Sequence, residues 1–473
     1  MGMQASQSER GGLPRGLSEA LQRAEHDARS KAAGFRWDPL TGLAAPSGAP
    51  LPSDPRGLSV LMTPGGKSLF HALEDGRVRV MWPGDAIAKA PEAVVITRTD
   101  LQALDARTLE LPQEAAGRLA AGDAKLVIDF STEGHAHSPT LSLRIHELLH
   151  RLGVRAKDCV YVTQDRGFRA DYLAHRRALG GGDDAFEVLV HDCYIQALCA
   201  PMRLVGPDVF NRNLGLYASA GRARRKRFLS LNNKLVYPHR TLFLLRLLRD
   251  GLWDSGHVSV GRLYAFDRQS LSRGQFVKRV RSAPELREQI DEVWPLLDQL
   301  EARSPTYFGV GEDTPRGGAT KSMVIPAMFD EYLESWFSVV AETEMDNRLR
   351  RITEKPFKPL LCFHPLIVFG SCGSLRLIRE YGFRTFPDLF DESYDQETDL
   401  RVRFEMVYDQ VVRLCRIGEA ELARACEAAT DALVFNAWWG LTRLPNLYRD
   451  RIDAALVDRL LGFVHGRQAA LPT

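Results

Sequence analysis

The sequence has no long apolar segment, no paired cysteine motif and no strong excess of charge of either sign. No run approaches the roughly 18 apolar residues that a membrane-spanning helix needs. The 7 cysteines include no Cys-x-x-Cys pair, and most sit in apolar runs, which disfavours a disulfide framework or a structural zinc site. A formal net charge of +2 argues against a general binder of polyanions. Any nucleic-acid or membrane role would therefore need a local basic patch.

The first residues, MGMQASQSERGGLPRG, contain no apolar core of the kind found in secretory signals. Together with cysteines of the reduced, buried type, this predicts a cytoplasmic chain without a membrane span. The run TPGGKS at 63–68 resembles a phosphate-binding loop only in part, because Leu61 stands where the motif requires glycine. We interpret it as a turn at the end of a strand.

A length of 473 residues exceeds one ordinary hydrophobic core, so two domains are expected. Apolar residues make up 45% and charged residues 26%, which is typical of globular proteins. The start of the chain is polar and then rich in Pro, Gly and Ala. We predict a flexible N-terminal segment (1–55), an N-terminal α/β domain (56–215), a second α/β domain (225–420) and C-terminal helices (421–473).

Short apolar runs alternate with longer amphipathic stretches in both halves, which favours parallel sheets covered by helices. The basic run 221–227, GRARRKR, separates the halves. The first half has strand-like runs at Leu58–Met62, Arg77–Met81, Ala93–Thr97, Lys125–Phe130, Cys159–Thr163 and Phe186–His191. The second half has them at 228–232, Val258–Tyr264, Trp336–Glu342 and Leu366–Phe369.

One loop of the first half carries two carboxylates and two imidazoles within nine residues. Asp129, Glu133, His135 and His137 directly follow a predicted strand, where ligands bind in open α/β sheets. Any of them could act as a general base. A metal held by His135 and His137 is an alternative without an obvious third ligand, and a plain capped loop is equally compatible with the pattern.

The stretch 352–395 carries most of the chemistry of the second half. A charged cluster, Glu354, Lys355 and Lys358, precedes the apolar run Leu366–Phe369. A small-residue turn, GSCGS at 370–374, then opens a helix-like segment. Such a strand–turn–helix can hold a phosphate on free backbone N–H groups. The alternatives are an exposed charge cluster at a helix start and an ordinary tight turn.

The same stretch resembles a bacterial and phage group described as glycosyltransferase-like. The matching motifs, in order, are TEKPFKP (353–359), HPLIVFG (364–370), GSL (373–375), GFRTF (382–386) and DESYD (391–395). The Glu–Lys pair is similar to the donor motif of fucosyltransferase-type enzymes with the GT-B fold. KRFLSLN (226–232), with His239 and Arg240, resembles the start of the donor domain in the same group. Pro356 departs from the pattern, which usually has Thr there.

The resemblance implies two facing Rossmann-like domains that transfer a sugar from a nucleotide-sugar to a hydroxyl acceptor (a glycan, a lipid-linked acceptor or a protein). No Asp-x-Asp triplet is placed to hold a metal, so a metal-independent transfer without a further cofactor is favoured. An inverting single displacement fits two facing domains, and a retaining transfer is the alternative. Glu354 would bind ribose hydroxyls. The expected contacts to the diphosphate are the side chains of Lys355, Lys358, Arg240 and Arg227 and the backbone of Gly370, Gly373 and Ser374. The base would come from the first domain, with Glu133 the first choice and Asp129, His135 and His137 the alternatives.

The acidic–aromatic motif DESYD follows the helix-like segment, so we favour a capping role for it over a ligand contact. A different functional class also fits: a non-catalytic nucleotide- or glycan-binding protein that retains the fold. Nucleic-acid binding by the basic run 222–227 is less favoured, because no aromatic residues are interleaved with it.

Overall fold

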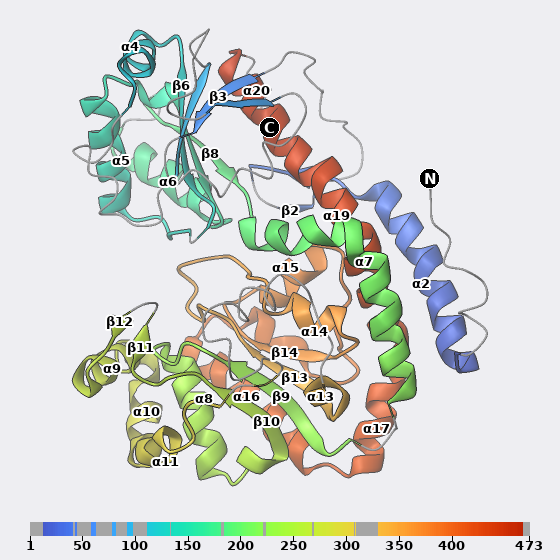
Figure 1. Cartoon of the computed structure of the whole chain (residues 1–473). Helices are drawn as coiled ribbons and strands as arrows, with labels where there is room; N and C mark the ends of the chain where they lie inside the picture. The colour runs from blue at the N-terminus through green and yellow to red at the C-terminus, as the bar shows by residue number, and fades with distance from the viewer. Residues whose placement is uncertain are drawn as a thin grey trace. The chain divides into compact units, whose positions relative to one another are not determined.

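The computed structural model describes residues 13–40, 43–44, 58–62, 78–81, 92–97, 111–132, 134–180, 184–220, 224–266, 269–306, 308 and 330–466 (Figure 1). The chain forms two compact units. Unit 1 comprises Met1–Ala33, Pro201–Asn347 and Ile352–Pro445, and unit 2 comprises Gly34–Ala200, Arg348–Arg351 and Asn446–Thr473. Each predicted domain is one continuous range, whereas both units are discontinuous in sequence.

Unit 2 is built on a parallel six-stranded sheet in the order β4–β3–β5–β6–β7–β8. The strands are β3 (Leu58–Met62), β4 (Val78–Met81), β5 (Ala93–Thr97), β6 (Lys125–Phe130), β7 (Cys159–Thr163) and β8 (Glu187–Val190). All six were predicted within a residue or two. The sequence pattern also predicts a helix near 101–109, and that range lies outside the described residues.

Both faces of this sheet are covered, which is why its strands are nearly continuous apolar runs. In β6, Leu126 and Ile128 pack into one core with helices α4 (Gln113–Ala121), α5 (Pro139–Arg151) and α6 (Phe168–Ala178). Val127 points to the other core, as the two-residue period of a strand requires. That second core contains helix α20 (Ala454–Val464), on the opposite side of the sheet from α5 and α6 (Figure 1).

Unit 1 contains a parallel four-stranded sheet in the order β10–β9–β13–β14. The strands are β9 (Lys226–Asn232), β10 (Gly256–Val260), β13 (Ser335–Ala341) and β14 (Leu366–Phe369). Helix α8 (Pro238–Arg249) is buried over most of its length, and its Phe243 packs 5.1 Å from Phe369, between ring centroids. The α/β class is therefore confirmed, with two parallel sheets and a helical C-terminal segment.

The remaining helices of unit 1 surround this sheet. Within the N-terminal segment, the sequence pattern predicts one helix near 17–33, and the structure has helix α2 (Arg15–Gly34) there, with an ion pair between Arg23 and Asp431 at 2.8 Å. The others are α9 (Arg273–Val280), α10 (Arg287–Val293), α11 (Leu297–Glu301), α13 (Asp330–Leu333), α14 (Phe357–Leu361), α15 (Ser374–Glu380), α16 (Leu400–Arg416), α17 (Glu419–Ala428), α18 (Thr430–Trp438) and α19 (Leu444–Leu447). The described residues also include two short antiparallel pairs, β1 (Trp37–Asp38) with β2 (Leu43–Ala44) and β11 (Ala265–Phe266) with β12 (Gln269–Ser270).

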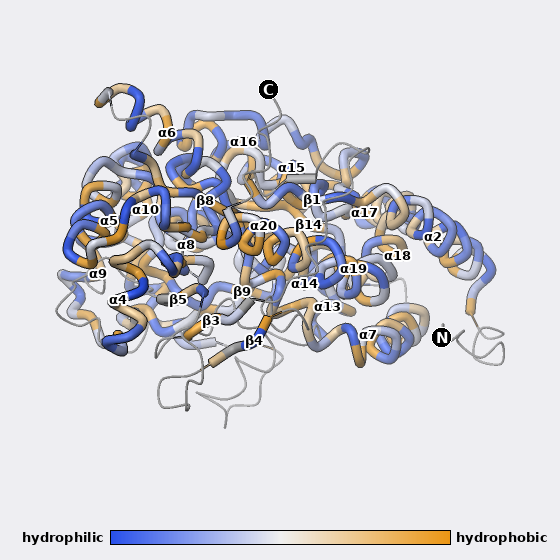
Figure 2. The backbone as a smooth tube through the Cα atoms, turned by 90° about the horizontal axis from the view of Figure 1, so that it is seen from above, coloured by the Kyte–Doolittle hydropathy of each residue, from blue (hydrophilic) through white to orange (hydrophobic). Residues whose placement is uncertain are grey.

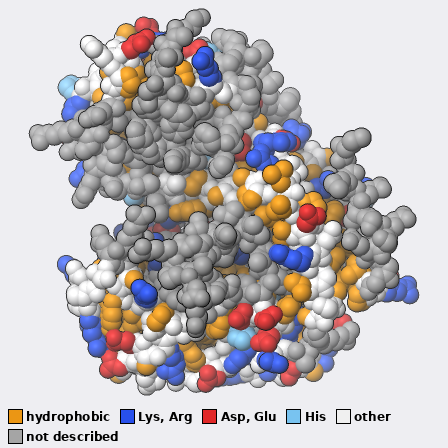
Figure 3. Space-filling model, viewed as in Figure 1, with side chains coloured by type: hydrophobic (Ala, Val, Ile, Leu, Met, Phe, Trp, Pro, Cys, Tyr) orange, Lys and Arg blue, Asp and Glu red, His pale blue; other side chains and the backbone are white. Residues whose placement is uncertain are grey.

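Helix α7 (Cys193–Ser219) begins in unit 2 and continues into unit 1 from Pro201. Apolar side chains gather over it in the space-filling view (Figure 3), and Leu204 is 85% exposed. By contrast, the apolar turns of α20, orange in Figure 2, are buried in unit 2. In the part of the chain that is described, no helix is both long and apolar enough to cross a bilayer.

Candidate functional site

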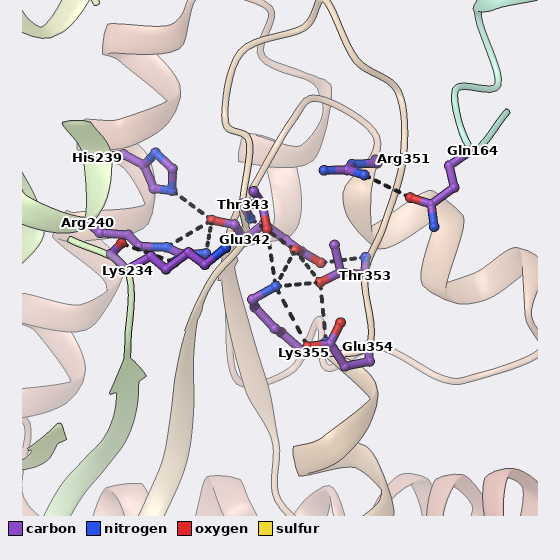
Figure 4. Close-up of polar contacts among 10 residues, drawn as sticks. All are labelled: Gln164, Lys234, His239, Arg240, Glu342, Thr343, Arg351, Thr353, Glu354 and Lys355. Carbon is purple, nitrogen blue, oxygen red and sulfur yellow. Dashed lines mark hydrogen bonds and ion pairs between the residues drawn. The ribbon is translucent and has the colours of Figure 1, made fainter. Parts of the chain in front are cut away.

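The sheet of unit 1 has a topological switch point at the carboxyl ends of β9 and β13. From β9 the chain crosses to β10 on one side and later returns to β13 on the other. Ligands of open α/β sheets bind where successive crossovers diverge in this way. Here the residues after β9 and after β13, Lys234 and Glu342, lie near each other (Figure 4). In unit 2 the equivalent point lies between β3 and β5, and the loops after those strands lie outside the described residues.

The backbone carbonyl of Glu342 is held by side chains from the start of α8. It accepts hydrogen bonds from His239 Nε2 at 2.9 Å and from Arg240 Nε and Nη2 at 3.1 and 2.8 Å (Figure 4). Arg240 Nη1 donates to the carbonyl of Lys234 at 3.2 Å. Arg240 was predicted to contact a diphosphate, but these three nitrogens bond to backbone carbonyls instead. Its guanidinium, 3% exposed, supplies positive charge to the switch point and fastens α8 to both strand ends.

The Glu342 carboxylate positions the motif that follows. It accepts hydrogen bonds from Thr353 N at 2.9 Å, Thr353 Oγ1 at 2.6 Å and Thr343 N at 3.2 Å. This role of Glu342 was not predicted from the sequence, although a carboxylate at the end of a predicted strand was the available signal. Through these bonds, Glu342 places residues 353–355 at the switch point.

Glu354 is buried, with 5% of its surface exposed. Its nearest ionic partner is Lys355, whose Nζ lies 3.8 Å from Oε1. Because only 5% of the residue is exposed, the alternative of an exposed charge cluster is wrong for Glu354. No described group donates a hydrogen bond to its carboxylate, whose oxygens are not among the fully buried polar atoms and so keep some contact with solvent.

The two lysines of the motif differ in their contacts. Lys355 Nζ donates to Thr343 Oγ1 and Thr353 Oγ1, both at 3.1 Å. Lys358 lies in the first turn of α14, where its carbonyl accepts from Cys362 N at 3.1 Å, while its ammonium forms no hydrogen bond or ion pair with a described residue. Burial lowers the pKa of Lys358, nearby Glu354 opposes that shift and Lys355 adds to it. A half-buried ammonium without an ionic partner, near a carboxylate that accepts no hydrogen bond, can receive a ligand that carries both anionic oxygens and hydroxyls.

The turn at 370–374 is already occupied by the protein's own groups. Asp395 accepts from Leu375 N at 2.8 Å, from Arg376 N at 3.1 Å and, through its carbonyl, from Gly373 N at 2.7 Å. Ser374 N bonds to the carbonyl of Ser371 at 3.1 Å. The prediction that Gly373 and Ser374 present free N–H groups to a phosphate is therefore wrong.

Gly370 and Gly373 instead shape this turn. A Cβ at Gly370 would lie 2.5 Å from Ser374 Oγ, and Gly373 has a left-handed φ of +83° that favours glycine. The capping role favoured for DESYD is confirmed by the bonds of Asp395.

Arg227 lies near the start of β9, so it is at the amino ends of the strands, whereas the switch point is at their carboxyl ends. Asn232 lies five positions further along the strand, a distance of about 16 Å. The structure therefore does not bring Arg227 to the other predicted donor contacts. Neither Arg227 nor the turn at 370–374 forms part of the cluster of Glu342, Glu354, Lys355 and Lys358.

The predicted base loop follows β6 in unit 2. Glu133, the first choice, lies outside the described residues. Asp129 is fully buried and accepts a hydrogen bond from Ser131 N at 2.9 Å. The His135 ring lies 5.5 Å from that of Phe130, between centroids, and His137 Nε2 pairs with Ser142 Oγ at 2.8 Å.

Helix α5 carries a second pattern that the sequence analysis missed, His146-Glu147-Leu148-Leu149-His150. Two histidines so spaced around a glutamate are typical of zinc peptidases. Here His146 Nε2 pairs with Tyr172 OH at 3.1 Å, and both histidines line a surface hollow. No three His, Cys, Asp or Glu side chains of the described chain are grouped so that they could hold a metal ion.

Comparisons of the chain with protein-family models, with curated proteins and with solved structures give no match.

Proposed function

We propose that the chain is a glycosyltransferase that moves a sugar from a nucleotide-sugar to a hydroxyl acceptor. The observation that carries the proposal is the Glu354 carboxylate, buried and without a hydrogen-bond donor at the switch point of a parallel sheet. A carboxylate that accepts two hydroxyl donors suits a ribose. The motif resemblance of residues 353–395 points to the same class.

In this proposal, unit 1 binds the donor. Ribose hydroxyls donate to Glu354, and the ammonium groups of Lys355 and Lys358 stabilise the charge that develops on the departing diphosphate. The acceptor oxygen bonds to the anomeric carbon while the sugar–phosphate bond breaks, and the bonding electrons leave with the diphosphate. The acceptor's proton passes to a base of unit 2. A GT-B-like arrangement, inversion at the anomeric carbon and independence from metal belong to the same proposal.

The test is a thermal shift of the full chain with UDP-, GDP-, CMP- and dTDP-sugars. We expect one nucleotide class to raise Tm, because a ligand that binds only the folded state stabilises it. Glu354→Gln and Lys358→Met should abolish the shift. Lys31→Met is the control, because Lys31 is also a lysine of lowered pKa but lies on α2, with its ammonium over the ring of Phe435.

A Tm that no nucleotide-sugar raises would refute the proposal, as would Glu354 and Lys358 variants that respond like the wild type. Release of nucleoside diphosphate then separates a transferase from the alternative, a non-catalytic binder. One observation favours the non-catalytic binder: the turn at 370–374 is occupied by Asp395, which removes one of the expected phosphate contacts.

A further inference from the structure

The carboxyl edge of β6, β7 and β8 in unit 2 contains buried polar atoms that have no hydrogen-bond partner. Ser131 and Thr132 follow β6, Asp165 lies two residues beyond β7, and His191 follows β8 directly. The unpartnered atoms are Ser131 Oγ, Thr132 Oγ1, Asp165 Oδ2 and both ring nitrogens of His191.

The strand register brings these residues to one place. Phe130 pairs with Thr163, and Thr163 pairs with Val190, so the three strands end level with one another. Adjacent strands lie about 4.8 Å apart, which places the three strand ends within roughly 10 Å. His191 N also donates to the carbonyl of Thr163 at 2.9 Å. We call Ser131, Thr132, Asp165 and His191 the β6–β8 edge cluster.

Only one of the two carboxylate oxygens of Asp165 accepts hydrogen bonds from the protein. Its Oδ1 accepts hydrogen bonds from Gly167 N and Arg350 N, both at 3.0 Å, and its own N donates to Thr163 Oγ1 at 3.1 Å. Oδ2 is buried and bonds to no described group. Burial raises the pKa of Asp165, against the two backbone donors. The carboxylate is thus fixed in orientation and keeps one acceptor for a ligand.

His191 is neutral in this setting. Its ring is fully buried, and its nearest carboxylate oxygen, Asp453 Oδ1, lies 3.9 Å from Nε2. Burial lowers the pKa of His191 to about 4, and the neighbouring Gln196 opposes this only in part. A neutral imidazole offers one donor and one acceptor.

The cations near the cluster already have partners. Arg351 donates to Gln164 Oε1 at 2.8 Å, Arg350 pairs with Asp171, and Arg166 lies 3.9 Å from Asp192. The unpartnered groups are therefore two hydroxyls, a neutral imidazole and a carboxylate oxygen. Together with the neighbouring cation Arg166, which offsets the charge of a carboxylate, this set matches an uncharged ligand rich in hydroxyl groups.

Each buried polar group without a partner costs about 1–3 kcal/mol, so several of them along one sheet edge require an explanation. We propose that the β6–β8 edge cluster binds the acceptor of the transferase, an uncharged sugar ring, with Asp165 Oδ2 and His191 as its hydrogen-bond partners. That the bound sugar is the acceptor of the transferase rests on the proposed function. The sugar-binding site itself is independent of it.

The test measures binding of a panel of methyl hexopyranosides to the full chain by saturation-transfer NMR. We expect at least one to bind saturably, and Ser131→Ala and Asp165→Asn to weaken binding about tenfold, equivalent to about 1.4 kcal/mol. Asp165→Asn keeps the Oδ1 acceptor and changes only the unpaired oxygen. Asp171→Asn is the matched control, since that carboxylate pairs with Arg350 outside the cluster.

The melting temperature of Ser131→Ala separates a ligand site from an internal water. A hydroxyl that awaits a ligand can be removed without lowering Tm, whereas one held by a buried water cannot. A lowered Tm, or no saturable binding of any glycoside, would overturn the inference. If nucleotide-sugars still raise the Tm of both variants, the donor site is intact, and a negative result counts against the β6–β8 edge cluster alone.

Discussion

At the scale of single residues, two carboxylates of the same motif stretch have opposite roles. Asp395 accepts two backbone N–H groups at the start of α15, so it serves the fold. Glu354 is as deeply buried but accepts none, which is the state expected of a ligand-binding group. Residue type and spacing do not separate the two, and only the donors around each carboxylate do.

We expect Asp395→Ala to lower the free energy of unfolding by about 1–3 kcal/mol, because it leaves buried N–H groups without an acceptor. Urea denaturation measures the change. Asp391→Ala is the control: Asp391 accepts from Ser393 N at an exposed position, and its loss should cost less. Equal effects of the two substitutions would contradict the assignment of Asp395 as a buried cap.

At the scale of elements, the amphipathic pattern predicts helices well but does not say where they dock. Helix α20 was expected among the C-terminal helices that follow the second domain. Instead its Leu456, Val457, Leu460 and Leu461 complete a core of unit 2. The sheet of unit 2 needs cover on both faces, and α20 provides it for one of them.

Leu460→Ala should destabilise unit 2 by about 2–5 kcal/mol, because it opens a cavity against the sheet. Hydrogen exchange checks this prediction, with amides of β6 and β7 exchanging faster while those of β9 and β13 change less. Val464→Ala, at a partly buried position of the same helix, should have a smaller effect. Equal acceleration in both sheets would argue against the placement of α20 in unit 2.

At the scale of the whole molecule, buried neutral histidines occur in both units. Burial lowers the pKa of His191 to about 4, and those of His239 and His364 to about 3. His364 accepts from Ser338 Oγ at 2.7 Å and donates to the carbonyl of Ser335 at 2.9 Å, so its environment suits the neutral ring. Protonation of any of these rings is favoured in the unfolded chain.

Lowering the pH should therefore destabilise the protein already at pH values well above those at which its carboxylates titrate. These histidines contribute stability that is fully present above the unfolded pKa near 6.5 and is lost as pH falls towards 3–4. Each costs up to about 1.4 kcal/mol per pH unit in that window. Urea denaturation at pH 7.5 and 5 measures the loss, and His364→Gln should reduce it. A free energy of unfolding that is equal at both pH values would refute this prediction.

The sequence by itself determined which segments form strands and helices, because that information is local. Apolar runs such as Cys159–Thr163 and the cap at Ser138, which accepts from Leu141 N, need only near neighbours. It also pointed to Glu354 and Lys358 through their motif. Tertiary structure decided the partners of each group. Asp395 accepts from Leu375 N, 20 residues earlier in the chain, and Arg240 donates to backbone carbonyls instead of a ligand.

The β6–β8 edge cluster shows the same limit, since its residues follow three different strands. They become neighbours only because parallel strands end level at one edge of the sheet. Sequence patterns record the spacing along one element, whereas contacts between elements depend on sheet order. For that reason the chain alone yields the elements and some of the candidate residues, and the fold decides which of them remain available to a ligand.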